Sequence, residues 1–275
     1  MSLTAAFTAA VVLLAACGTA SPSAGAGGAA GAFSPATPGV LTVATAEIPV
    51  PGFWEGPAAA PDGGFEHDLA RALADRFGLA SVRVVQVPFD RLAGGDLGGA
   101  DLALSQLTRT EARAQRLDFS VRYLPASPSA LVRAGTQVPD LNAAQQLRWA
   151  VHQGTTLDAD LSNLIKPIPP PLRAPDQAGA VAALEQGSVD AVLLDLPVAL
   201  ALAYRSSGRL AVVAQLATDD SIAAALPKGS TNLDAVDSAI RSFSSTGVLD
   251  NLAQRWLGTR LVDGTVNVPI LRIGP

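Results

Sequence analysis

Short β-branched runs alternate with helical segments along the chain, and this alternation limits the possible folds more than any other feature. Residues 40–45 and 82–87 have the composition and spacing of strands. Between them, apolar residues recur every four positions over 65–77 and form a single helical face. A helix between two strands at this spacing indicates βαβ units and a mainly parallel sheet.

The same alternation restarts after about Arg133. A strand is predicted over 147–151, a helix from about Leu157, a second helix over 178–186 and a buried strand over 189–194. The two halves of the chain are therefore expected to have a similar build.

A short sequence echo supports this division. Gly-Gly-Ala-Asp-Leu-Ala-Leu at 98–104 corresponds to Gly-Ser-Val-Asp-Ala-Val-Leu at 187–193, and each predicts a helix end, a tight turn, an aspartate and a strand. A late strand over 221–226 and a helix over 232–245 follow. We predict an α/β protein of two lobes, each a mainly parallel sheet flanked by helices.

Composition excludes several classes of function. The 275 residues suit two lobes of ordinary size, and the net charge of −5 argues against a nucleic-acid-binding protein, which needs a basic surface. The one cysteine and two histidines allow no internal disulfide and no zinc site of the usual ligands. We expect neither a metal nor a cofactor, and a monomer.

The N-terminal segment has the features of an export signal. Its apolar run over 5–16 is too short to span a bilayer but suits the hydrophobic region of a signal peptide. Leu14-Ala15-Ala16-Cys17-Gly18 resembles the lipobox of bacterial lipoproteins, which implies a lipoprotein signal peptide over 1–17 in which Cys17 is lipidated and becomes the mature N-terminus. An ordinary secretion signal with an incidental cysteine is the alternative. Because no Lys or Arg precedes the apolar run, the position of the true N-terminus stays open.

A segment rich in Gly, Ser, Ala and Pro follows over 18–38. Such a composition buries too little apolar surface to offset the entropy of ordering, so we expect a flexible tether. Together with a lipidated cysteine, it would hold an extracytoplasmic body at the outer face of the cytoplasmic membrane. A single acyl chain binds weakly, so multiple acylation is expected.

Four further segments carry motifs of one known family. They are Gly64-Phe65-Glu66-His67-Asp68-Leu69-Ala70; Phe89-Asp90-Arg91-Leu92 followed by Asp101; Thr108-Arg109-Thr110-Glu111-Ala112-Arg113 with Asp118-Phe119-Ser120; and Gly154-Thr155-Thr156 followed by Asp190-Ala191-Val192-Leu193-Leu194-Asp195. In this order, the chain from about Leu41 to Gly258 resembles the bacterial extracellular solute-binding proteins of family 3, the polar amino-acid receptors of ABC importers.

This resemblance implies a periplasmic-binding-protein-like fold, in which two lobes enclose a ligand and are joined by two crossing strands. The crossings are expected near Arg133 and Ala217. The expected divisions are 39–133 with 218–262 for the first lobe, 134–217 for the second and 263–275 for a C-terminal tail.

The resemblance also implies a site for both charges of an α-amino acid. Arg113 would clamp the carboxylate, because its planar fork matches two carboxylate oxygens. Thr155 and Thr156 lie where a strand gives way to a helix, and backbone N–H groups at a helix start attract anions. Asp195, just past a strand of the second lobe, would bind the ammonium.

Other residues are expected to complete the site. Phe89 and Trp54 would form apolar walls, although Trp54 and Glu47 occupy a loop that departs from the family pattern, so plain packing is their alternative. Glu47, if it points into the pocket, would favour a cationic or amide side chain. If it does not, Gln106 and nearby donors would accept an acidic or amide side chain. First-lobe hydrogen bonds are assigned to Ser105, Gln106 and Thr108, whereas Glu66, His67 and Asp68 are expected to be residues of a helix start.

The implied function is capture of a polar amino acid and its delivery to an ABC permease, without catalysis. The alternatives are a stand-alone amino-acid sensor, a dehydratase on the same scaffold, and the ectodomain of a receptor kinase or channel. A dehydratase needs a positioned general acid beyond the ligand-binding charges, and the sequence indicates none apart from Glu47. An ectodomain needs a spanning segment after Gly258, and none is seen.

Overall fold

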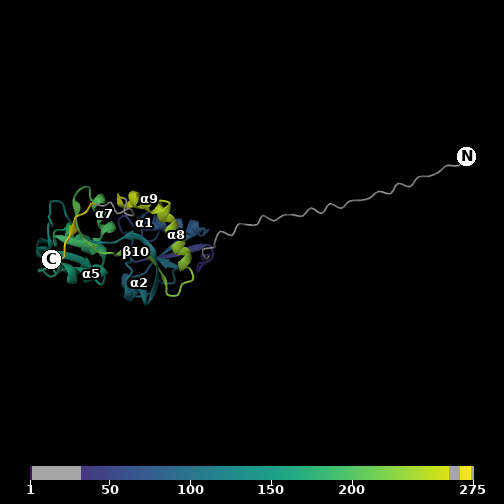
Figure 1. Cartoon of the computed structure of the whole chain (residues 1–275), viewed down its shortest axis with the longest axis horizontal. Coiled ribbons are helices and arrows are strands. Elements are labelled where there is room, and N and C mark those ends of the chain that lie inside the picture. The colour runs from purple at the N-terminus through teal and green to yellow at the C-terminus, as the bar shows by residue number, and fades with distance from the viewer. Residues whose placement is uncertain (2–31, 260–266, 274–275) are drawn as a thin grey trace.

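The computed structural model describes Met1 and residues 32–259 and 267–273. Two β-sheets, each flanked by helices, lie side by side along the long axis of the molecule (Figure 1). The predicted signal peptide apart from Met1, including Cys17, and most of the tether lie outside the described residues. Of the predicted C-terminal tail, residues 267–273 are described. No described helix has the length and apolar content needed to cross a membrane.

The first sheet has the order β2-β1-β3-β10-β4. Its strands in the described chain are β1 (Val40–Thr45), β2 (Ser81–Gln86), β3 (Leu102–Ala103), β4 (Leu117–Pro125) and β10 (Ser221–Pro227). The pairs of β1 with β2 and β3 are parallel, as the βαβ pattern predicts, whereas β10 runs antiparallel to both of its neighbours.

The second sheet has the order β11-β9-β5-β8-β6-β7. Its strands in the described chain are β5 (Pro128–Arg133), β6 (Trp149–His152), β7 (Leu172–Ala174), β8 (Ala191–Asp195), β9 (Leu210–Leu216) and β11 (Ile270–Leu271). Here β5 is the strand that runs antiparallel to both neighbours. The two-lobed α/β fold is confirmed, with sheets that are mixed because β5 and β10 each enter from the opposite lobe.

Helices cover both sheets. The first lobe contains α1 (Phe65–Arg76), α2 (Phe89–Ala93), α3 (Glu111–Ala114), α8 (Leu233–Ser245) and α9 (Val248–Leu257). The second contains α4 (Leu141–Gln146), α5 (Thr156–Asp160), the π-helical turn η1 (Leu161–Ile165), α6 (Gln177–Glu185) and α7 (Leu196–Arg205). Side chains of α1, α8 and β4 pack against one another in the core of the first lobe. Helix α7 packs on both β9 and α9 and so links the two lobes.

The chain changes sheet twice, at neighbouring points. It leaves β4 at Pro125 and enters β5 at Pro128, and it returns over 217–220 between β9 and β10. The Ala126 N–H donates to the Asp220 carbonyl at 2.9 Å, so the two crossings are hydrogen-bonded to each other. The second crossing includes Ala217. The first precedes the expected position near Arg133, because β5 already pairs with β8 and β9.

The echoed aspartates have equivalent structural roles. Asp101 accepts the backbone N–H groups of Thr42 at 2.8 Å and Ala36 at 2.7 Å, and Thr42 belongs to the neighbouring strand β1. Asp190 accepts the backbone N–H of Arg148 at 3.0 Å and its guanidinium at 2.6 Å, at the start of the neighbouring β6. In each lobe the aspartate therefore fastens one strand to the next.

Gly64 joins α1 to the loop before it. Its φ of +114° favours glycine, and a Cβ here would lie 2.1 Å from the Phe53 carbonyl oxygen, so no other residue fits without a shift of backbone. The close approach lets the Phe65 N–H donate to the Gly52 carbonyl at 2.8 Å. This contact holds the loop over 50–54 against the start of α1.

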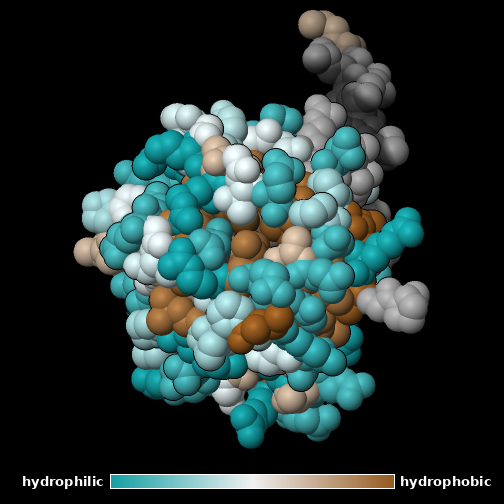
Figure 2. All heavy atoms as spheres, turned by 90° about the vertical axis from the view of Figure 1, so that its left-hand side faces the viewer, coloured by the Kyte–Doolittle hydropathy of each residue, from teal (hydrophilic) through white to brown (hydrophobic). Residues whose placement is uncertain are grey.

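Figure 2 views the end of the second lobe. Hydrophilic residues cover most of this face, and hydrophobic residues gather in several separate groups between them. Most large apolar side chains of this lobe lie inside, in a core that includes Val132, Trp149, Leu161 and Leu193. The lobe therefore has its own packed interior, which gives the site a rigid support.

Candidate functional site

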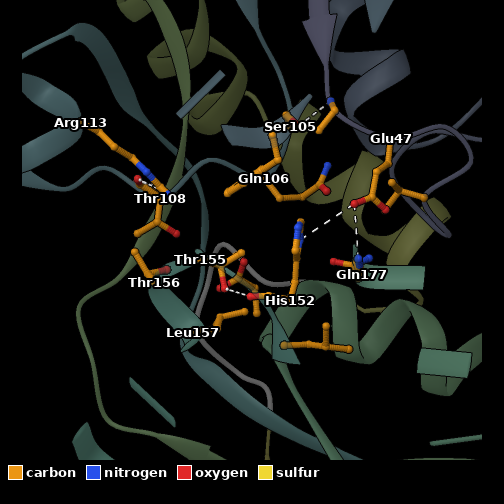
Figure 3. Close-up of a pocket in the computed structure, with 15 residues that line it drawn as sticks. Glu47, Ser105, Gln106, Thr108, Arg113, His152, Thr155, Thr156, Leu157 and Gln177 are labelled. Atoms are coloured by element: carbon orange, nitrogen blue, oxygen red, sulfur yellow. Dashed lines mark hydrogen bonds and ion pairs between the residues drawn. The ribbon is translucent and has the colours of Figure 1, made fainter. Parts of the chain in front are cut away.

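A pocket opens between the lobes, and its lining comes from both (Figure 3). All predicted ligand-binding residues except Trp54 line it. The described lining residues are Ala46, Glu47, Val50, Phe89, Ser105, Gln106, Thr108, Arg113, His152, Thr155, Thr156, Leu157, Gln177, Leu194 and Asp195.

Arg113 is held rigidly at the first-lobe side of the pocket. It lies on the short helix α3, whose N-cap residue Thr110 accepts the Arg113 backbone N–H at 3.2 Å. Its guanidinium donates to the Thr108 carbonyl at 2.8 Å and lies 5.4 Å from the centre of the Phe89 ring. Burial lowers the pKa of Arg113, and the charge of Asp195 opposes that shift. The result is a buried, preorientated cation with donors left for a ligand.

Asp195 faces the pocket from the second lobe, at the junction of β8 and α7. Burial raises the pKa of its carboxyl to about 8; Asp220 and Asp160 add to the rise and Arg113 opposes it. A carboxylate in this position lacks the stabilisation that water or a close cation would supply. A ligand ammonium would supply it.

Thr155 and Thr156 lie at the start of α5. The Thr155 hydroxyl donates to the His152 carbonyl at 2.8 Å and accepts the Asp158 N–H at 3.3 Å, so it is used in capping the helix. What remains for a ligand is the Thr156 hydroxyl and the backbone N–H groups of the first turn, which favour an anion.

Ser105, Gln106 and Thr108 follow directly after β3, where parallel strands end at the cleft. The Ser105 hydroxyl accepts the Ala46 N–H at 2.9 Å and so ties this segment to the end of β1. Thr108 forms an isolated bridge with Ile222 of β10. These contacts fix the first-lobe floor of the pocket.

Glu47 connects the lobes across the pocket. Its carboxylate accepts the Gln177 N–H at 3.3 Å and lies 4.0 Å from His152 Nδ1 (Figure 3). His152 also lies over Phe89, with the ring centres 5.1 Å apart. Burial raises the pKa of Glu47 and lowers that of His152, so both shifts favour the neutral forms and weaken the ion pair.

His152 and Gln177 are pocket residues that sequence reasoning missed. His152 ends β6 and Gln177 begins α6, so both occupy ends of second-lobe elements that face the cleft. Their positions next to the predicted Gly154-Thr155-Thr156 turn and at the start of a predicted helix were the available signal.

Trp54 is not a wall of the pocket. Its side chain is fully buried, and its indole N–H donates to Glu66 at 2.8 Å and to the Leu104 carbonyl at 3.1 Å. The polar edge of the indole therefore turns toward a buried carboxylate, and the ring packs in the first core. Glu66 is a residue of the α1 start, as predicted, but it is buried completely.

Two α/β lobes that share a pocket containing a buried arginine and a buried carboxylate define a two-lobed small-molecule binding protein. The described residues contain no group of three or more His, Cys, Asp or Glu side chains suited to a metal ion. A family model matches residues 58–259, and the chain belongs to the bacterial extracellular solute-binding proteins, family 3.

Comparisons with individual proteins agree with this membership. The L-cystine-binding protein TcyJ of Escherichia coli (strain K12) is 29% identical over 201 residues, covering 71% of this chain and 74% of TcyJ. The crystal structure of an amino acid ABC transporter substrate-binding protein from Streptococcus pneumoniae Canada MDR_19A, bound to L-arginine, superposes with a TM-score of 0.68 at 29% identity, covering 81% of this chain and 95% of that one.

Another relative is a larger protein. The membrane-bound lytic murein transglycosylase F of Idiomarina loihiensis is 32% identical over 209 residues, which cover 71% of this chain and 45% of that protein. The chain thus spans about half of this relative's length.

Proposed function

We propose that this protein is the substrate-binding component of an ABC importer and carries a polar α-amino acid in the cleft. The observation that supports this most directly is the pairing of a buried arginine and a buried carboxylate, Arg113 and Asp195, in one pocket from opposite lobes. An α-amino acid presents a carboxylate and an ammonium at fixed separation, and such a pair is complementary to both.

Ligand binding would also favour a closed arrangement of the two lobes. The cation comes from the first lobe and the carboxylate from the second, so only the closed arrangement contacts both ends of the ligand. The ligand then favours the closed state by its differential contacts. The 126–127 and 217–220 crossings would act as the hinge.

The side chain of the ligand meets Glu47, which lines the pocket. A partly buried carboxylate there favours a cationic or amide side chain over an acidic one. We propose a polar or cationic amino acid as the substrate class.

The best first measurement is a thermal-shift screen of the purified protein against the common amino acids and several cyclic acids. At a hundred times its dissociation constant, a ligand that binds only the folded state adds about 2.7 kcal/mol to the free energy of unfolding. For a protein of this size the expected rise in melting temperature is about 5–11 °C. If the folded, ligand-free protein shows no shift with any amino acid, the proposal is wrong.

Binding is proposed to occur without turnover. Mass spectrometry of the screened ligands after incubation with the protein should recover each of them unchanged. Conversion of a bound ligand would instead indicate an enzyme on this scaffold.

We also propose that the protein is a monomeric, extracytoplasmic lipoprotein anchored through Cys17. Replacing Cys17 with serine removes the acylated thiol, so the protein is expected to move from the membrane fraction to the soluble fraction of expressing cells. Ser23→Ala, a change in the same segment that keeps the cysteine, is the matched control and should stay at the membrane. Unchanged membrane association of Cys17→Ser would indicate a different anchor.

A further inference from the structure

A buried carboxylate lies directly behind the pocket without lining it. Glu66, the second residue of α1, is 0% exposed and accepts four hydrogen bonds. Two come from the Trp54 indole, at 2.8 Å, and the Tyr123 hydroxyl. The other two come from Gln106, one from its backbone N–H at 2.9 Å and one from its side-chain amide. Burial raises the pKa of Glu66 to about 7, and all four donors act to lower it.

Gln106 is the residue that connects this carboxylate to the pocket. It lines the pocket beside Ser105 and Thr108, and Figure 3 shows its side chain extending into it. Its φ of +48° places a non-glycine residue in the left-handed region, which costs free energy unless the surroundings compensate. The bond from its backbone N–H to Glu66 supplies such compensation.

The carboxylate also decides which way the Gln106 amide faces. Both oxygens of Glu66 accept hydrogen bonds in the structure, and the Gln106 amide turns its nitrogen toward one of them. In the part of the chain that the structure describes, no donor contacts the amide oxygen of Gln106. That oxygen is the acceptor left for a ligand.

We propose that Glu66 is a positioning residue that determines specificity: by holding both N–H groups of Gln106, it presents the amide oxygen of Gln106 to the ligand. The cleft then selects an amino acid whose side chain carries an N–H donor, an amide or a cationic group, over one that ends in a carboxylate. This inference rests on the proposed function and names the substrate class of the same site.

The test measures dissociation constants by titration calorimetry on the whole protein. For each amino acid with a donor side chain, the constant is divided by that of the amino acid whose side chain ends in a carboxylate. Glutamine is compared with glutamate and asparagine with aspartate, and arginine and lysine extend the series. The wild type is expected to prefer donor side chains. In Glu66→Gln the residue at 66 can itself donate, so the Gln106 amide is free to turn, and the preference should fall roughly tenfold, the factor expected for one hydrogen bond in the site.

Tyr123→Phe is the matched control. It removes a donor to the same carboxylate but leaves both Gln106 bonds, so the preference should change by less than about twofold even if stability falls. The change in preference caused by Glu66→Gln must also depend on Gln106. In a protein that already carries Gln106→Met, Glu66→Gln should therefore cause no further change in preference. If Glu66→Gln does not fold, Gln106→Met alone should lower the preference by the same factor of roughly ten, because Glu47 still favours donor side chains. An unchanged preference would overturn the inference.

Three other results would also overturn it. They are an equal loss of affinity for all ligands in Glu66→Gln, an additional change on the Gln106→Met background, and a wild type that binds glutamate or aspartate more tightly than every donor-bearing amino acid. A wild type that binds no amino acid at all would refute the proposed function itself, whereas binding without the expected response to Glu66→Gln refutes only the role of Glu66.

Discussion

Arg113→Ala is expected to lose nearly all affinity for the amino acid. The guanidinium is buried beside Phe89 and its place is fixed by Thr108, so its removal leaves the ligand carboxylate desolvated and unpaired. Truncating one partner of a buried charge pair costs about 2–5 kcal/mol, which corresponds to a 30-fold to 5,000-fold rise in dissociation constant. Titration calorimetry with the ligand found in the thermal screen measures it.

Arg116→Ala provides the matched control, because Arg116 is exposed and follows Arg113 by three residues. Its affinity should equal that of the wild type, and the melting temperatures of both unliganded variants would show whether either is misfolded. An Arg113→Ala protein that binds within about threefold of wild type would rule out this arginine as the carboxylate clamp.

Asp195→Asn is expected to weaken amino-acid binding by a similar factor but to spare analogues that lack the amino group. The buried carboxylate is complementary to an ammonium, and asparagine keeps its shape while removing the charge. Comparing each amino acid with its deaminated acid separates loss of the ammonium contact from general damage. Equal losses for both ligands would count against Asp195 as the ammonium partner.

The pH dependence provides an independent check. In the unliganded protein the pKa of Asp195 is raised to about 8, and an ammonium beside it favours the charged form and lowers that pKa. Binding at pH 7 should therefore release a proton, and affinity should fall about tenfold per pH unit below 8 until the pKa of the bound state is reached. Calorimetry in buffers of different ionisation enthalpy measures the release, which should be absent in Asp195→Asn.

Local periodicity was sufficient for much of the secondary structure. The strand predicted over 40–45 has those bounds in β1, and the helix predicted over 65–77 is α1 with one residue fewer. The echoed aspartates marked strand starts in both lobes because each accepts a backbone N–H from the neighbouring strand or the residue just before it, Thr42 in one lobe and Arg148 in the other. The segment over 117–133, in contrast, offered no helical interruption, so the sequence alone did not reveal that β4 and β5 belong to different sheets.

The binding site, like the fold, was only partly predictable from the sequence. The resemblance to the family predicted which side chains should meet, from Glu47 to Asp195, and all of them except Trp54 line the pocket. The sequence determined the alternation of strand and helix, because that pattern depends on neighbours three or four residues apart. Tertiary structure decided the partners of buried polar groups, such as Glu66 with Trp54 and Gln106, because a buried donor or acceptor must be satisfied by whatever the packing brings within 3 Å, however distant it is in the chain.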